Sequence, residues 1–200
     1  MDTAFVIGNG ESRPIFPIQD LKGKGIIYGC NAIYRDHPML CDHIVAVNPP
    51  MYEELAQWHN NGKESPNIYG PEDISGWNYI CEGDKETDTP KNLKLYRIWR
   101  GGDIKRGNGI RTIDFALNKG SGMSAVLMAA ESGIKNVVML AFDILGSRQW
   151  ERDTPSRQQN NMYKNTINYP ERQSMKAYLK YEWMFQLRQI IRKHPNTNFH

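Results

Sequence analysis

The chain of 200 residues contains only three cysteines, Cys30, Cys41 and Cys81. Their number is odd and no two of them are spaced as C-x-x-C, so the sequence predicts neither a disulfide framework nor a thiolate metal site. No stretch approaches the roughly 20 apolar residues that a membrane span needs. The first residues lead into a short apolar segment rather than a signal peptide. We therefore expect a cytoplasmic protein in a reduced compartment, without a membrane span.

Several motifs of metal and hydrolytic chemistry are also missing. The chain has no D-x-D pair of the kind that holds a divalent ion against a nucleotide diphosphate, and no G-x-S-x-G nucleophile elbow. Its five histidines show no ligand spacing, and we interpret His37, His43 and His59 as packing or surface residues. The sequence thus predicts no protein-held metal and disfavours a hydrolase.

Charge gives little indication of a partner. The formal net charge is +3, and lysine and arginine are scattered along the chain rather than gathered into one block, so nucleic acid is an unlikely partner. The hydrophobic fraction of 40% and the aromatic fraction of 10% predict a folded chain. Its length suits one domain over residues 1–200, with a loop-rich insert or lid over residues 63–110. Self-association into a homo-oligomer is left open.

Apolar runs alternate with helical patterns along most of the chain. Strands alternating with helices imply right-handed crossovers, so we predict an α/β class, a Rossmann-like fold in which helices flank a mostly parallel sheet. We expect a short final strand near the carboxyl terminus, and little regular structure over residues 63–92. The predicted strands are 3–7, 26–28, 44–47, 93–99 and 136–142, and the predicted helices are 50–60, 121–133 and 171–193.

Two glycine-rich turns are candidate anion sites. Gly8-Asn9-Gly10 closes the first strand, where we expect positive φ and backbone N–H groups free to face a phosphate, with Asn9 and Ser12 beside them. A tight structural turn is the alternative. Ser121-Gly122 begins a helix whose N–H groups favour negative charge, although Ser121 also fits an ordinary N-cap and Gly133 the matching C-cap.

Polar residues follow four of the predicted strands, namely Asn9, Asn31, Asn48 and Asp143. Ligands of open α/β sheets bind beyond the carboxyl ends of the strands, so these side chains are candidate ligand contacts. Asp143 could orient a ribose or a base, act as a carboxylate base, or hold loop backbone.

A polar stretch precedes the last helix. Its side chains could close over a ligand as phosphate or carboxylate donors, or they could form a solvated loop. The residues concerned are Tyr163, Asn165, Asn168, Tyr169 and Arg172.

Together these features resemble a known family. The Gly-Asn-Gly-x-Ser turn, an Asn after the second strand, Asn-Pro after the third, a glycine-bearing helix start and a strand ending in Phe-Asp resemble bacterial sialyltransferases of the Campylobacter type, glycosyltransferase family 42. The same framework is similar to Rossmann-like proteins that include the archaeal hydroxymethylpterin pyrophosphokinase. The resemblance covers most of residues 3–172.

The resemblance implies a pocket for a cytidine monophosphate donor, with Tyr163 and Tyr169 on its phosphate. Two departures stand out: Glu11 occupies a position where the family has proline, and Glu171, Arg172 and Gln173 stand where the family places a histidine general base. The pocket residues implied by position are Gly8, Asn9, Gly10, Ser12, Asn31, Asn48, Ser121 and Gly122.

The leading hypothesis is a metal-independent glycosyltransferase-like protein that uses a nucleotide-activated donor and no other cofactor. Tyr163, Tyr169 and Arg172 would stabilise the leaving phosphate, and Asp143 is the candidate base. One alternative is a Mg²⁺-dependent, pyrophosphokinase-like phosphotransferase, in which the nucleotide brings the metal. Another is a non-catalytic module that binds a nucleotide, a signalling molecule or another protein.

Overall fold

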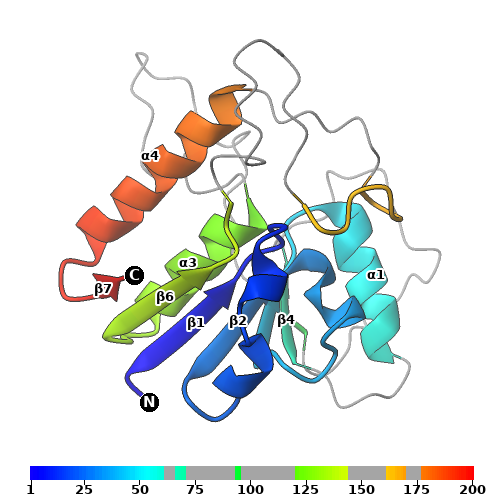
Figure 1. Ribbon diagram of the computed structural model, residues 1–200, viewed down its shortest axis with the longest axis horizontal. Coiled ribbons are helices and arrows are strands. Elements are labelled where there is room, and N and C mark those ends of the chain that lie inside the picture. The colour runs from blue at the N-terminus through cyan, green and yellow to red at the C-terminus, as the bar shows by residue number, and fades with distance from the viewer. Residues whose placement is uncertain (61–65, 71–92, 96–119, 144–160, 170–176) are drawn as a thin grey trace.

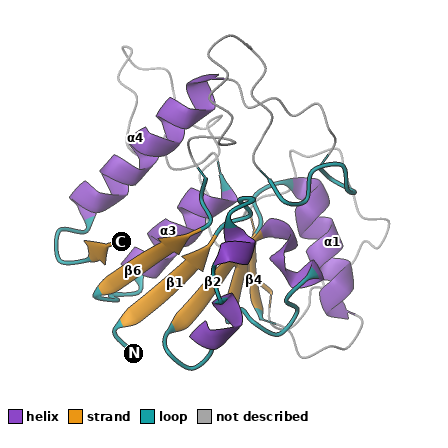
Figure 2. Cartoon of the chain, in the orientation of Figure 1, coloured by secondary structure: helices purple, strands orange, loops and turns teal. Residues whose placement is uncertain are grey.

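A computed structural model describes residues 1–60, 66–70, 93–95, 120–143, 161–169 and 177–200. The described segments form one parallel sheet with helices against both of its faces (Figures 1 and 2). This is the predicted α/β class with a Rossmann-like arrangement. Its strands are β1 Thr3–Ile7, β2 Ile26–Cys30, β3 His43–Val45, β4 Asn67–Gly70, β5 Leu93–Leu95, β6 Asn136–Leu140 and β7 Asn198–Phe199.

The strand order is β5-β4-β3-β2-β1-β6-β7, and all neighbouring pairs are parallel. The chain moves outward from β1 to β5 and then returns to place β6 on the other side of β1. The direction of winding therefore changes between β1 and β6. In open α/β sheets such a switch point, at the carboxyl ends of the strands, is where ligands bind.

Helices and short 3₁₀ turns connect the strands and cover the sheet. The connections between β1 and β2 and between β2 and β3 within the described chain are 3₁₀ helices rather than α-helices. The α-helices are α1 Pro49–Asn60, α3 Ser121–Glu131 and α4 Ala177–Lys193, and the 3₁₀ helices are η1 Arg13–Ile15, η2 Ile18–Leu21 and η3 Asn31–Arg35.

The alternation of side chains along β1 divides the core into two layers. Ala4 and Val6 lie in the layer that α3 and α4 cover, where Ile190 of α4 is fully buried. Ile7 lies in the opposite layer, together with α1, η3 and the 161–169 segment. Burial of apolar surface on both faces of the sheet is the main force that holds these layers together.

Most predicted elements are found, with altered boundaries. The predicted strand at 136–142 ends at Leu140 because Ala141 takes a φ of 55°, outside the range of a strand. Residues 67–70, which we predicted to be irregular, form β4 beside β3. This strand was missed because it contains only two apolar residues, Ile68 and Tyr69, which are too few to show the period of a strand. The final strand is present as β7, and Gly133 follows α3 with a φ of 77°.

The described segments contain no helix with the length and apolar character needed to cross a membrane.

Candidate functional site

The loops that leave β1 and β6 are tied together at the switch point. The Gly8 N–H donates to the Leu140 carbonyl oxygen at 2.8 Å, and the Gly10 N–H donates to the Ala141 oxygen at 2.8 Å. A Cβ atom on Gly8 would lie 2.4 Å from the Ala141 oxygen. Glycine is therefore needed here because two backbones approach closely. The predicted positive φ is wrong, since the only described glycines with positive φ are Gly23 and Gly133.

Asp143 closes this junction by binding Ser12. One carboxylate oxygen, Oδ2, accepts from the Ser12 N–H at 2.9 Å, and the other accepts from the Ser12 hydroxyl. A Cβ atom on Gly10 would collide with the same carboxylate, 2.4 Å from its carbon. Of the roles considered for Asp143, holding loop backbone is the one that this geometry displays.

These bonds correct the simplest form of the phosphate-cradle hypothesis. The N–H groups of Gly8, Gly10 and Ser12 all donate to atoms of the β6 exit, so they are not free to face an anion as we predicted. Any ligand at this edge must therefore be recognised mainly by side chains or by other amides.

Ser121 joins the ends of β2 and β3 to the start of α3. Its hydroxyl donates to Asn31 Oδ1 at 2.7 Å and accepts from the Val47 N–H at 3.1 Å. The prediction that Ser121 is the N-cap is wrong, because Gly120 occupies that position and makes no side-chain cap. The serine hydroxyl is used for tertiary contacts instead.

The remaining glycine and asparagine of the predicted pocket have different surroundings. Gly122 leaves room for an aromatic ring, since a Cβ atom there would lie 2.9 Å from Phe142 Cε1. Asn48 is exposed on the segment that leads from β3 into α1. Gly122 is therefore needed for packing against Phe142, whereas Asn48 lies at the surface of the same sheet edge.

Arg13, which sequence reasoning did not select, lies at the centre of the site. Its side chain is only 1% exposed. Nη2 lies 2.6 Å from Asp36 Oδ2 and 2.6 Å from Tyr163 Oη, and Nη1 lies 3.3 Å from Asn9 Oδ1. The Tyr163 hydroxyl also donates to Asp36 at 2.8 Å. A guanidinium has five donors and a fixed charge, so it can bind these three groups together.

A second arginine fixes the 161–169 turn. Arg35 forms a two-point ion pair with Glu54, with Nε at 2.7 Å from Oε1 and Nη2 at 2.6 Å from Oε2. It also donates to Thr166 Oγ1 at 2.8 Å and to the Ile167 carbonyl oxygen at 3.0 Å. Asn168 donates to the same Glu54 carboxylate at 2.8 Å. These bonds attach the turn to η3 and α1.

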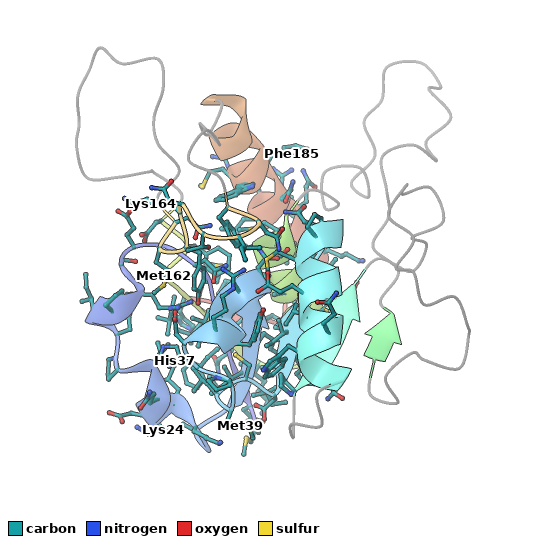
Figure 3. The ribbon with its side chains drawn as sticks, turned by 90° about the vertical axis from the view of Figure 1, so that its right-hand side faces the viewer. Lys24, His37, Met39, Met162, Lys164 and Phe185 are labelled. Carbon is teal, nitrogen blue, oxygen red and sulfur yellow. The ribbon has the colours of Figure 1, made fainter. Side chains whose placement is uncertain are left out.

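The turn also contacts the segment that follows β1. The Met162 N–H donates to the Asn9 carbonyl oxygen at 3.0 Å, and Lys164 pairs with Glu11 at 2.6 Å. Figure 3 shows Met162 and Lys164 beside this segment. Glu11, the residue that departs from the family resemblance, thus helps to hold the turn in place.

Both predicted tyrosines are buried in this turn. Their ring centroids lie 5.8 Å apart, and the Arg35 guanidinium carbon lies 5.7 Å from the Tyr163 centroid and 6.0 Å from that of Tyr169. Burial raises the pKa of both hydroxyls, so each stays protonated at neutral pH. The Tyr163 hydroxyl is used by Arg13 and Asp36, whereas the Tyr169 hydroxyl makes no well-formed hydrogen bond within the described residues.

Backbone strain is concentrated at this end of the sheet. Within the described segments, the non-glycine residues with positive φ all lie in the loops after β2 and β6 or in the 161–169 turn. Such conformations cost about 1–3 kcal/mol each and persist where surrounding structure enforces them. The residues are Asn31, Ala141, Asp143, Asn165 and Asn168.

Other candidate groups do not join the site. Cys30 and Cys41 are buried, and burial raises the pKa of both thiols, that of Cys30 to about 12, which disfavours a nucleophilic role. Arg172 lies outside the described residues. No cluster of three metal-ligating side chains occurs in the described segments. The metal-independent mechanism stays a prediction.

No family model, curated protein or solved structure matches this chain. The fold defines its class, a Rossmann-like α/β protein with polar side chains gathered at the carboxyl edge of a parallel sheet.

Proposed function

We propose that the chain binds a nucleotide or nucleotide-sugar at the carboxyl edge of the sheet and acts as a glycosyltransferase-like protein. The observation that carries the proposal is the Arg13 network. This network joins Asn9, at the exit of β1, to Tyr163, 150 positions distant from Arg13 in the sequence. A buried arginine that fixes two predicted ligand residues is typical of a preorganised site.

The position of this network supports the proposal. Asn9 lies at the switch point between β1 and β6, and Asn31 follows the neighbouring strand β2. The strained residues of the described chain lie at the same edge. Strain of this kind is found disproportionately at ligand sites and active sites, which favours a binding role for this edge.

In the proposed transfer, the chain's own residues bind and orient the donor. Tyr169 would remain protonated and would donate its hydroxyl hydrogen to the leaving phosphate, since this buried hydroxyl makes no well-formed hydrogen bond within the described residues. The hydroxyl hydrogen of Tyr163 is already donated to Asp36, so Tyr163 would act by holding Arg13 and the 161–169 turn in place.

A thermal-shift series tests the binding step. We expect one of CMP, CDP, UMP, UDP, GDP, ADP, ATP or NAD to raise the melting temperature, since a ligand at a hundred times its Kd adds about 2.7 kcal/mol of stability. Asn9→Ala should abolish the shift, whereas Asn196→Ala, at an exposed position before β7, should preserve it. A full panel without any shift would overturn nucleotide binding.

A transfer assay tests the chemistry. With the donor identified, turnover that persists in a chelator is expected for the metal-independent transferase, and turnover abolished by the chelator would favour the phosphotransferase alternative. The readout is release of the nucleotide leaving group.

A binding module without chemistry is the second candidate. It is favoured by Asp143, the proposed base, whose two carboxylate oxygens both accept hydrogen bonds from Ser12. A carboxylate committed to loop backbone is poorly placed to remove a proton from an acceptor hydroxyl. Tight nucleotide binding with no turnover across donors would support this candidate.

A further inference from the structure

We infer that the ligand group recognised at the ends of β1 and β2 is an uncharged hydrogen-bond acceptor, such as a base carbonyl, a ring nitrogen or a sugar oxygen. The inference rests on the proposed function and specifies which part of the ligand this edge contacts. Its basis is the orientation of two asparagine side chains, together with the pairing of the nearby cations with carboxylates.

The amide of Asn9 is oriented by Arg13. An arginine only donates, so the Asn9 atom 3.3 Å from Nη1 must be the carbonyl oxygen Oδ1. The other end of the amide, Nδ2, is therefore a donor directed away from Arg13. Asn9 is partly exposed, so a ligand can reach this side chain.

Ser121 orients the amide of Asn31 in the same way, with the amide oxygen facing a donor of the protein. The serine oxygen accepts the Val47 N–H, which leaves its hydroxyl hydrogen to be donated to Asn31 Oδ1. The Asn31 Nδ2 group is then also a donor. Asn31 is held at a φ of 50° and is partly exposed, so its backbone position is fixed while its amide stays within reach of a ligand.

Tyr169 indicates where the Asn9 donor points. The Asn9 side chain acts on the buried Tyr169 hydroxyl to lower its pKa, against the larger effect of burial. A group that lowers the pKa in this way is a donor, so the Asn9 atom that faces Tyr169 is Nδ2, and one of its two hydrogens is left for a ligand.

Charge pairing indicates that the acceptor is neutral. Arg13 pairs with Asp36, Arg35 with Glu54 and Lys164 with Glu11, each at 2.6 Å. Arg13 contacts Asn9, Arg35 contacts the 161–169 turn and Lys164 lies in that turn, and each of these cations already faces a carboxylate. A polyphosphate placed against them would compete with those carboxylates, whereas a neutral acceptor would not.

The experiment is a calorimetric titration of the full chain, in a chelator, with the four common ribonucleosides, their 5′-monophosphates and their triphosphates. The test variant is Asn31→Asp, which keeps the shape of the side chain, tolerates the positive φ and still accepts from Ser121, but replaces the donor with an acceptor. Asn9→Asp is the second variant. Asn196→Asp adds the same charge at the amino edge of the sheet and serves as the control.

We expect one nucleoside to bind within about tenfold of its mono- and triphosphate, and this affinity to change little between about 0.05 M and about 0.5 M salt. Asn31→Asp should weaken binding of that nucleoside by at least about tenfold, while Asn196→Asp leaves it unchanged.

Three results would overturn the inference, and they differ in what they say of the proposed function. Nucleotides that bind only through their phosphates, with affinity rising at each added phosphate and falling with salt, would reject the neutral acceptor and leave nucleotide binding standing. Unchanged nucleoside binding in both Asn31→Asp and Asn9→Asp would do the same. Failure of every nucleoside and nucleotide to bind would reject the proposed function together with the inference.

Discussion

Arg13 Nη2 lies 2.6 Å from Tyr163 Oη, although the two residues are separated by 150 positions in the sequence. The arginine is almost completely buried and also contacts Asp36 and Asn9. A single side chain thus links the exit of β1, the segment after β2 and the 161–169 turn. The local order of the candidate site depends on this link.

Replacement of Arg13 by Met should destabilise the fold by about 2–3 kcal/mol, because Asp36 and Tyr163 lose a charged donor. The partial exposure of Asp36 limits the loss, since water can solvate its carboxylate. The measurement is urea unfolding. Lys135→Met breaks the exposed pair with Asp2 and serves as the control, and its stability should be close to that of the unchanged chain because water screens this pair. Equal losses in the two variants would contradict the role given to Arg13.

Gly8→Ala should cost about 1–3 kcal/mol, because its Cβ atom would lie 2.4 Å from a backbone oxygen of the β6 exit. Gly120→Ala is the matched control, since within the described residues its Cβ atom would meet nothing closer than the Trp183 indole nitrogen at 3.6 Å. Its backbone is extended, and loss of glycine at an N-cap costs at most about 1 kcal/mol. Thermal unfolding measures both. A Gly8→Ala protein as stable as Gly120→Ala would show that the two loops can separate without cost.

The two tyrosines of the turn should respond differently to replacement by Phe. Tyr163→Phe removes bonds to Arg13 and Asp36 and should cost about 1–3 kcal/mol, whereas Tyr169→Phe removes an unpaired buried hydroxyl and should be neutral or stabilising. Urea unfolding gives both values. In the proposed transferase, Tyr169→Phe should also slow transfer far more than it weakens binding. Similar losses in transfer and binding would remove its role on the leaving phosphate.

Stability should fall at alkaline pH. Burial raises the pKa of Tyr163 and Tyr169 in the folded chain, whereas the unfolded chain ionises its tyrosines near the ordinary value of about 10. At pH values between about 10 and the raised pKa of the folded chain, the unfolded state binds fewer protons than the folded state. The free energy of unfolding therefore decreases as pH rises above about 10, and these two tyrosines do not affect it at lower pH.

Urea unfolding from about pH 8 to about pH 11 measures this dependence. Tyr169→Phe removes one of the two groups, so its stability should fall less steeply with pH than that of the unchanged chain. Parallel curves for the two proteins would show that Tyr169 ionises normally in the folded state. Tyrosine absorbance in the folded protein provides an independent check, since buried hydroxyls should remain protonated above pH 10.

Local sequence patterns were enough to predict most of the sheet and its helices. The short apolar runs of Thr3–Ile7 and of β6 are typical of buried strands, and the spacing of Met123, Val126 and Ala130 follows the period of a helix. β4 was missed because a short strand between polar residues has no such period.

The candidate site was predicted only in part. Asn9, Asn31 and the two tyrosines were selected because they follow strands or lie in a polar segment before the last helix. Arg13 and Asp36 carry no local signal that separates them from ordinary loop charges, so they were not selected. The burial of Arg13 and its pairing with Asp36 depend on segments that meet only after folding.

By itself the sequence determined the alternating pattern of strands and helices, and with it the parallel sheet whose carboxyl edge gathers Asn9, Asn31 and Asn48. Hydrophobic period and turn residues are local properties, which is why they could be read along the chain. Tertiary structure alone decided how these groups are used: Gly8 for close approach, Asp143 for holding Ser12, Ser121 for orienting Asn31, and Arg13 for orienting Asn9. The bond between Ser12 and Asp143 joins residues 131 positions apart, and the bond between Asn31 and Ser121 joins residues 90 positions apart. Such bonds are set by how the layers pack, and no local pattern encodes them.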